Sequence, residues 1–484
     1  MSDQIENIQA AGQAAGQTPQ LTNAATYWKF MGQCTECGHC REACASLSCA
    51  GLNLGQIAKR MLAAQRKAAQ AQVEGETAEV PSLAQVIAAD PNLVQAVRGC
   101  FFCTSCQQTC FAHNDVSELI YAARIDFQNL GLIPRDAWSS VLVDQEWDIF
   151  TAYRAIWGIG YADLTRHFTS DYGEAQTDCQ IAFFPGCSLA AYGPELTREV
   201  FDTLEEVGGK TTMIDHCCGS PLKSAGFYDR AEALCDKIAG EIATSGARIV
   251  VCACPGCKNA LVSTMKRNNM DVKVTTVSEY LLEQGFTPKR DCSQLAMCFS
   301  KSCQDRDGSC LAATRELLGA TDEQTTVFHG CCGAGGAVSA YDYNRQGQQV
   351  DKKLSFAKDG EMVVTMCPTC TYTYAFQLMS APRALDNANY LELLFLNGFD
   401  WNKVSSQLNS MWTGQDGPWR ASGFSEAHAF GARKVGKRGC VCPSAFVLLQ
   451  FLQGLRGTPA ALTYVGLFEK LDACSAEKEA SRRF

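Results

Sequence analysis

The stretch VFHGCCGAGGAVSA, residues 327–340, contains two adjacent cysteines followed by a glycine, and a similar stretch, IDHCCGSPLKSAG, covers residues 214–226. From about residue 178 onwards, short apolar runs alternate with segments of helical periodicity, which is the pattern of α/β organisation. The repeated order predicts an internal duplication, with a first module over 178–290 and a second over 291–400. The two adjacent pairs are Cys217–Cys218 and Cys331–Cys332.

Each adjacent pair has three companion cysteines: one that precedes it, and a Cys-Pro-x-Cys segment that follows. Five thiols exceed the four ligands of a mononuclear zinc site. Neighbouring Cα atoms lie about 3.8 Å apart, whereas disulfides prefer about 4.4–6.8 Å, so the pair suits two ligands of one iron–sulfur cluster better. A strained disulfide between the neighbours, acting as a redox switch, is the alternative.

Two further cysteine groups lie near the N-terminus, and both follow the spacing C-x2-C-x2-C-x3-C. This is the bacterial ferredoxin run, whose fourth cysteine ligates the other of two clusters. Zinc is the alternative, although its ligands usually come in pairs. The proline that usually follows the fourth cysteine is Ala45 in one run and Phe111 in the other, which removes no ligand. The sequence predicts two cubane [4Fe–4S] clusters, one held by Cys34, Cys37, Cys40 and Cys110, the other by Cys100, Cys103, Cys106 and Cys44.

The composition limits the function classes. The chain has 484 residues and 28 cysteines, and its net charge of −9 argues against nucleic acid as a partner. The polar N-terminus lacks a signal peptide. We therefore expect residues 1–27 to be a disordered leader on a cytoplasmic protein, where cysteines bind metal or serve catalysis. No apolar run approaches the roughly 18 residues that span a bilayer, and the longest, residues 445–455, is interpreted as a buried helix.

Residues 28–170 predict a small helical domain around the first nine cysteines. Helical periodicity covers 51–72 and 83–97. A third helix is predicted over 115–131, with Asp115 as its N-cap. The predicted fold is therefore a multi-domain α+β or α/β protein, in which a helical ferredoxin-type domain is followed by two duplicated α/β modules.

Two ferredoxin runs followed by two CCG modules resemble the D-type subunit of heterodisulfide reductase, which is equivalent to the C-type subunit fused to the B-type subunit. The segment RGCFFCTSCQQTCFAHNDVSELIYAARIDFQNLG resembles the second cluster segment of the C-type subunit and the helix behind it. FFPGCSLAAYGPELTREVFDTLEEVGG and CCGSPL resemble the start of the B-type subunit. The resemblance covers roughly residues 28–398.

The resemblance implies that each five-cysteine set can hold a non-cubane [4Fe–4S] cluster and that a disulfide is cleaved between the two. One or two such clusters are expected. The second set departs from the family, because a common His-Asp-Pro-Cys segment is Ser300-Lys301-Ser302-Cys303 here, and nearby Cys298 is an alternative to Cys303. Carried over by position, the sets are Cys187, Cys217, Cys218, Cys254 and Cys257, and Cys303, Cys331, Cys332, Cys367 and Cys370.

His216 and His329 lie beside the adjacent pairs. Reducing a disulfide to two thiols consumes two protons, so both are candidate proton donors. We favour a supporting hydrogen bond to a cluster or to a backbone carbonyl. Residues 401–484 form an appendage of unknown role. Six further cysteines are interpreted as small buried side chains, namely Cys49, Cys179, Cys235, Cys252, Cys292 and Cys310. The three cysteines of the appendage are interpreted as spare thiols, namely Cys440, Cys442 and Cys474.

The sequence therefore predicts an iron–sulfur oxidoreductase subunit of heterodisulfide reductase type. Electrons would pass through the cubanes to the clusters of the modules, which reduce or form a small disulfide. No Gly-rich phosphate-binding fingerprint stands out, so the flavin or haem is expected on a partner, either a flavoprotein subunit or a membrane cytochrome b. Such a partner would bring the chain to the inner face of the membrane.

Two alternatives remain open. One is an electron-transfer subunit like the iron–sulfur subunits of anaerobic glycerol-3-phosphate dehydrogenase and glycolate oxidase, which passes electrons from a partner flavoprotein towards quinone. The other is a redox sensor or scaffold that uses zinc in the modules.

Overall fold

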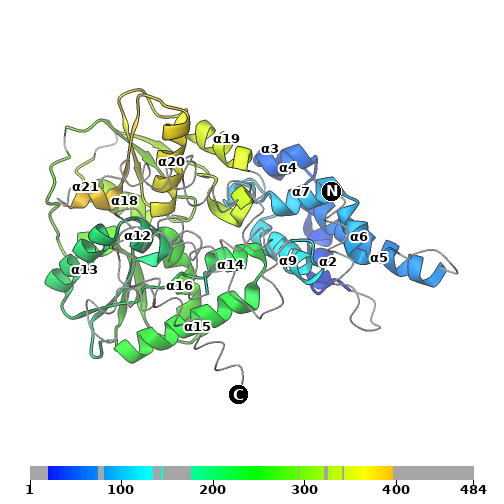
Figure 1. Cartoon of the computed structure of the whole chain (residues 1–484), viewed down its shortest axis with the longest axis horizontal. Coiled ribbons are helices and arrows are strands. Elements are labelled where there is room, and N and C mark those ends of the chain that lie inside the picture. The colour runs from blue at the N-terminus through cyan, green and yellow to red at the C-terminus, as the bar shows by residue number, and fades with distance from the viewer. Residues whose placement is uncertain are drawn as a thin grey trace, which may run out of the picture.

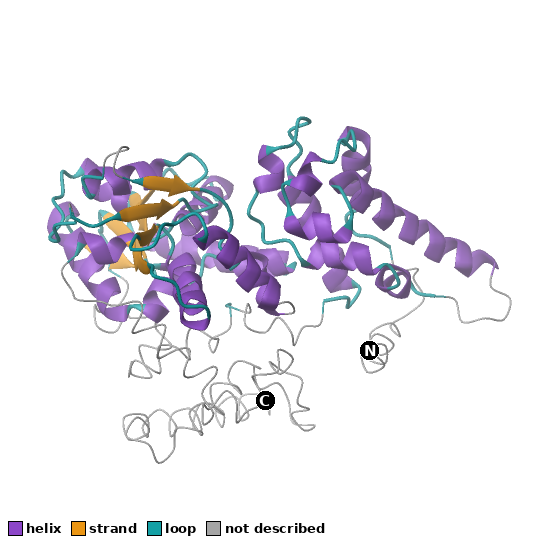
Figure 2. Cartoon of the chain, turned by 90° about the horizontal axis from the view of Figure 1, so that it is seen from above, coloured by secondary structure: helices purple, strands orange, loops and turns teal. Residues whose placement is uncertain are grey.

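The computed structural model describes residues 20–74, 81–133, 143–144, 176–292, 294–320, 325–340 and 343–395. Its described part has an all-helical end and an α/β end that contains all the strands (Figures 1 and 2). Residues 1–19 of the predicted leader and the appendage, with its three cysteines, lie outside the described residues. The prediction that the disordered leader extends to residue 27 is wrong, because Leu21 and Tyr27 are buried in the core and a helix begins at Ala24.

The helical domain, the described residues up to 133, is built around one apolar core. Helix α5 (Leu54–Glu74) confirms the predicted first helix. The segment 83–97, predicted as one helix, is two, because a residue before proline avoids the α conformation. Asp90 stands at that break and its carboxylate accepts from the backbone N–H of Leu93. The other helices are α2 (Ala24–Gln33), α3 (His39–Glu42), α4 (Ala45–Ala50), α6 (Leu83–Ala88), α7 (Pro91–Arg98) and α8 (Ser105–Gln108).

Helix α9 (Val116–Asn129) ends the domain and lies beside the α/β part (Figure 1). Its predicted N-cap is confirmed, since the Asp115 carboxylate accepts from the N–H of Ser117 at 2.9 Å. Tyr27 of α2 donates to Asp126 of α9 at 2.6 Å, and burial raises the pKa of that carboxyl. The two helices are thus joined by a buried hydrogen bond.

The α/β part consists of two four-stranded, all-parallel sheets of the same topology, ordered β2-β1-β3-β4 and β6-β5-β7-β8. This confirms the predicted duplication. The strands of the first module are β1 (Ile181–Phe184), β2 (Thr211–Met213), β3 (Ile249–Cys252) and β4 (Lys273–Thr276). Those of the second are β5 (Met297–Ser300), β6 (Thr326–Phe328), β7 (Met362–Thr365) and β8 (Asp386–Asn389).

Helices connect the parallel strands, as crossover connections require. In the first module they are α12 (Gly186–Tyr192), α13 (Pro194–Gly208), α14 (Ser220–Ala225), α15 (Tyr228–Ser245), α16 (Pro255–Arg267) and α17 (Val277–Glu283). In the second they are α18 (Ser309–Leu317), the 3-10 helix η2 (Gly335–Ala340), α19 (Tyr343–Leu354), α20 (Pro368–Ser380) and α21 (Tyr390–Leu394).

One apolar core is shared by the two modules. Alternate residues of a strand face opposite sides of its sheet, and Phe183 of β1 lies in the same core cluster as Phe299 of β5. The neighbouring side chain Phe184 belongs instead to a core of the first module alone, and Cys298 to a core of the second alone. The two sheets are therefore packed together as one body through their inner faces.

Candidate iron–sulfur site

The module cysteines follow the carboxyl ends of three neighbouring strands in each sheet. In the first module, Cys187 follows β1, the adjacent pair follows β2, and Cys254 follows β3. The carboxyl ends of parallel strands lie at the same edge of the sheet, and the chain leaves β1 and β3 in opposite directions. Open α/β sheets bind their ligands at such a point, so the cysteines stand at the expected binding edge. The second module repeats the arrangement with Cys303 after β5, the adjacent pair after β6 and Cys367 after β7. Cys187 lies in the first turn of α12.

Each Cys-Pro-x-Cys segment forms the start of a helix. Cys254 is the N-cap of α16 and Cys367 the N-cap of α20, with the proline at the first helical position, where its missing N–H costs nothing. The Cys254 sulfur accepts from the N–H of Cys257 at 3.3 Å. The positive end of each helix thus faces its thiols and favours thiolates there.

The five thiols of the first module form one connected group. Cys217 interacts with Cys187 and Cys218, and these contacts, together with burial, raise the pKa of Cys217. Cys218 interacts in turn with Cys257, which neighbours Cys254. The sequence-predicted set is therefore brought together in the fold.

In the second module, Cys303 rather than Cys298 stands with the other thiols. Cys331 interacts with Cys303, and the Cys370 thiol lies 3.1 Å from that of Cys332. Cys298 is fully buried in the middle of β5, and burial, with the nearby Glu361 carboxylate, raises its pKa to about 12. Cys303 follows its central strand by three residues, as Cys187 does in the first module.

The thiol groups of the two modules meet each other. Cys254 of the first module and Cys367 of the second interact, which lowers the pKa of Cys367. Beside them the hydroxyls of Ser188 and Thr369 lie 2.6 Å apart. The rings of Tyr192 and Tyr372 stack with centroids 4.7 Å apart.

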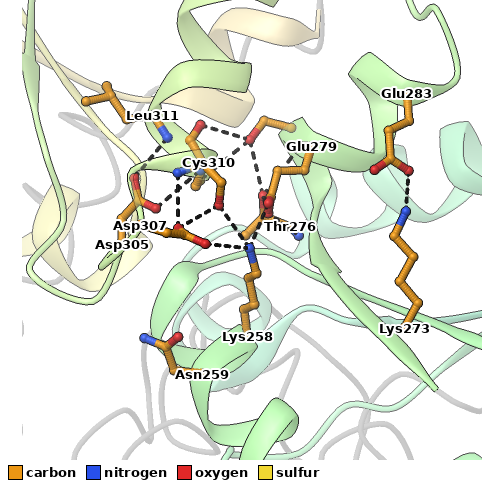
Figure 3. A network of polar contacts seen from close by, with 12 residues as sticks. Lys258, Asn259, Lys273, Thr276, Glu279, Glu283, Asp305, Asp307, Cys310 and Leu311 are labelled. Atoms are coloured by element: carbon orange, nitrogen blue, oxygen red, sulfur yellow. Dashed lines mark hydrogen bonds and ion pairs between the residues drawn. The ribbon is translucent and has the colours of Figure 1, made fainter. Parts of the chain in front are cut away.

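A polar network holds the helix of Cys254 and Cys257 against the loop of Cys303 (Figure 3). Lys258 donates to Glu279 at 2.7 Å within the first module and to Ser309 of the second at 3.0 Å. Asn259, the next residue, donates to the carbonyl of Gln304 at 2.6 Å. Lys258 and Asn259, which directly follow Cys257, thus fix the distance between the cysteine group of the first module and that of the second.

Cys44 of the first N-terminal run lies among the thiols of the second run. The thiols of Cys100, Cys103 and Cys106 interact electrostatically with one another and with the thiol of Cys44 of the first run. In the first run, Cys40 interacts with Cys34 and Cys37. Phe111, which follows Cys110, packs edge-on against His39 of the first run, with ring centroids 4.8 Å apart. The assignment of Cys110 to the first cluster stays a prediction.

The second N-terminal run also touches the second module. Cys103 interacts with Cys331, and this contact is the first cause that lowers the pKa of Cys103 to about 6. The approach depends on Gly336, which has φ of +67°, and on which a Cβ atom would lie 2.0 Å from the carbonyl oxygen of Cys100. The glycines behind the adjacent cysteines therefore allow the module and the helical domain to meet backbone to backbone.

One buried arginine joins the three parts. Arg124 of α9 is fully buried, and its five N–H groups donate to five backbone carbonyls. Its guanidinium also lies 4.8 Å from the centroid of the Phe102 ring. The acceptors are Val97, Arg98 and Cys100 of the helical domain, Ser224 of the first module and Gly336 of the second. Sequence reasoning missed this residue, whose only signal is a charge on the apolar face of a predicted helix.

The cysteine sets fit iron–sulfur clusters in donor chemistry and in space. Soft thiolates are the ligands that such clusters take. A Cβ atom on Gly186 would lie 2.9 Å from the sulfur of Cys257, and one on Gly55 would lie 2.8 Å from that of Cys34, so glycine leaves room beside the thiols. In the part of the chain that the structure describes, no three His, Cys, Asp or Glu side chains are arranged to hold a single metal ion. Cluster ligands differ from such a set, because they are distributed over several irons.

The two histidines differ in their contacts. Both carboxylate oxygens of Glu241 lie 2.9 Å from Nε2 of His216, which is a different partner from the cluster or backbone carbonyl that we favoured. His329 is exposed; partial desolvation of its ring, together with the nearby Lys301 and Lys353, lowers its pKa.

Among the spare cysteines in the described residues, Cys49 was predicted to be buried, and this is wrong because its position on the short helix α4 faces solvent. Five others are buried as predicted, namely Cys179, Cys235, Cys252, Cys292 and Cys310.

Comparison with known proteins identifies the modules. The cysteine-rich domain called CCG matches residues 181–262 and 298–374, so the chain contains two CCG domains, one in each α/β module. The B-type subunit of fumarate reductase (CoM/CoB) from Methanothermobacter marburgensis is 24% identical over 204 residues, 40% of this chain and 40% of that protein. An uncharacterized iron–sulfur protein of Methanocaldococcus jannaschii is 26% identical over 211 residues, 42% of each chain. The chain thus spans about two fifths of the length of these relatives.

These likenesses support an iron–sulfur electron-transfer subunit, consistent with the resemblance to heterodisulfide reductase. Within the described residues, no helix has both the length and the apolar character needed to cross a membrane.

Proposed function

We propose that this chain is the iron–sulfur subunit of a thiol–disulfide oxidoreductase of heterodisulfide reductase type. Two cubane clusters would be held by the N-terminal runs, and one non-cubane cluster by each five-cysteine set. When bound, such clusters supply single electrons next to a substrate sulfur. The reaction takes two electrons and two protons to convert one disulfide into two thiols, or the reverse.

The observation that carries the proposal is the unbroken succession of cysteines from the helical domain to both modules. Cys103 meets Cys331, and Cys367 meets Cys254. Two one-electron sites that face each other suit a two-electron substrate, and the contact between the modules supports such an arrangement. A simple relay towards quinone needs no second five-cysteine set.

The chain's own residues orient and enclose this site. The stacked tyrosines and the Ser188–Thr369 hydrogen bond keep the two groups opposed. Most of the module thiols are buried, which excludes water from them. The exposed ring of His329 is the candidate for moving a proton at the second module, whereas His216 is engaged with Glu241.

We propose a flavoprotein or a membrane cytochrome b as the partner that carries the two-electron cofactor. The name of the Methanothermobacter relative links coenzyme M and coenzyme B with fumarate reduction. A disulfide of two small thiols is therefore the substrate class to test first, and the partner would place the chain in the cytoplasm at the membrane face.

The test is anaerobic purification followed by iron, zinc and sulfide analysis and by EPR of the oxidised protein, with and without candidate thiols. We expect about sixteen irons per chain, as four [4Fe–4S] clusters require, and a paramagnetic signal that appears only when thiol is added. The Cys332→Ser variant should lose that signal and keep the reduced-cubane signals. Cubane signals alone, with no response to any thiol, would contradict disulfide chemistry and favour the relay. Zinc in place of iron would favour the scaffold.

A further inference from the structure

The two modules differ in one buried charge, Lys353 of α19. The exposed fraction of this residue is 2%, and among the described residues its ammonium nitrogen has no hydrogen-bond partner. The nitrogen lies 4.7 Å from the centroid of the Phe328 ring. Burying an ammonium without a hydrogen bond or a counter-charge costs several kcal/mol. An anion beside it would offset that cost.

The neighbourhood of Lys353 is the second cysteine set. A Cβ atom on Gly330, the residue before Cys331, would lie 3.3 Å from the Lys353 nitrogen. One helical turn earlier, Gln349 donates to the carbonyl of Cys331 at 3.3 Å, so the same face of α19 covers the adjacent pair. Burial lowers the pKa of Lys353 to about 8, while Cys370, Cys332, Cys331 and Cys303 act in the opposite direction.

The first module has no such charge at the equivalent place. Helices α15 and α19 share the pattern Tyr-x-Arg followed later by Asp-Lys, which aligns Lys353 with Ile238. Ile238 is fully buried in the apolar core of its module. The duplicated modules therefore surround similar thiol sets with different electrostatics.

We propose that Lys353 is a positioning residue that balances the negative charge of a thiolate-ligated cluster in the second module, and so holds that cluster at a higher reduction potential than its counterpart in the first module. This inference rests on the proposed function. A fixed positive charge stabilises the reduced, more negative form. Because the second module also touches the helical domain through Cys103, the module that receives electrons first is the one made easier to reduce.

The test is an EPR-monitored redox titration of the full chain, anaerobically purified, as wild type and as Lys353→Met, Lys353→Arg and Lys352→Met. The signal lost in Cys332→Ser is assigned to the second module. In Lys353→Met we expect the equilibrium constant for reduction of that cluster to fall at least tenfold, which is about 59 mV for one electron. Lys353→Arg should restore most of the shift. Lys352→Met removes an exposed charge from the same helix and should leave the potential unchanged.

The possible outcomes distinguish the role of Lys353 from the proposed oxidoreductase function on which it rests. A second-module cluster whose potential moves equally little in Lys353→Met and Lys352→Met overturns the inference and leaves the function standing. A rise in the KM for the disulfide with no change in potential also overturns it, and assigns Lys353 to an anionic group of the substrate. A wild-type chain without iron in the second module overturns both. Iron and sulfide contents equal to those of wild type show that the variants have folded.

Discussion

Replacing Arg124 by methionine tests how the helical domain is held against the two modules. Methionine has a similar length and no donor, so all five carbonyls lose their hydrogen bond. A net value of about 1 kcal/mol per hydrogen bond gives about 5 kcal/mol in total. Relief from burying a guanidinium offsets part of this, whereas each carbonyl left buried without a donor costs about 1–3 kcal/mol, so the net loss is about 3–5 kcal/mol. We expect a loss of stability in that range.

The assay is thermal unfolding under anaerobic conditions, with circular dichroism to follow the fold and limited proteolysis to follow the domain junction. At about 2–4 °C per kcal/mol, Arg124→Met should melt at least about 6 °C below wild type. It should also be cleaved faster than wild type in limited proteolysis. Arg124→Lys keeps a charge and at most three donors, so an intermediate melting temperature is expected.

The control is Arg66→Met, which removes an exposed arginine from α5 of the same domain and should melt within about 1 °C of wild type. If Arg124→Met matches that control in melting temperature and in proteolysis pattern, Arg124 does not join the three parts and the reasoning is refuted.

Three further predictions concern the modules and their contacts. Gly336→Ala places a Cβ atom against a backbone carbonyl of the second cysteine run, at a positive φ that alanine disfavours, and should destabilise the chain by about 2 kcal/mol. The measurement is the melting temperature, and an unchanged value would show that the two backbones do not meet. Lys258→Met removes a half-buried ion pair and the hydrogen bond to the second module, and should lower the free energy of unfolding by about 2 kcal/mol in the same measurement. The control Lys273→Met removes an exposed ion pair and should lower it by well under 1 kcal/mol. Equal losses in the two variants would show that the network does not hold the modules together. Cys303→Ser should lower the iron content of the purified chain by up to four atoms, whereas Cys298→Ser should retain it, and the reverse result would give the ligand role to Cys298.

Much of the fold and of the cysteine sets could be predicted from the sequence, because their signals are local. Ligand spacing along a loop, a Cys-Pro-x-Cys helix start and short apolar runs all act within a few residues. The repeated double cysteine then predicts two modules. The break between α6 and α7 is also readable, since Pro91 stands within the predicted helix, although the apolar periodicity continues through it.

The tertiary structure alone decided which distant groups meet. The contacts of Cys103 with Cys331 and of Cys254 with Cys367, the choice of Cys303 over Cys298, and the burial of Arg124 and Lys353 all depend on packing between elements far apart in the chain. No local pattern encodes such contacts, because the free energy of burying a charge or a thiol depends on what several other segments place around it. The residues that the sequence marks are thus the candidate ligands, while the structure reveals the charges and glycines that set their surroundings.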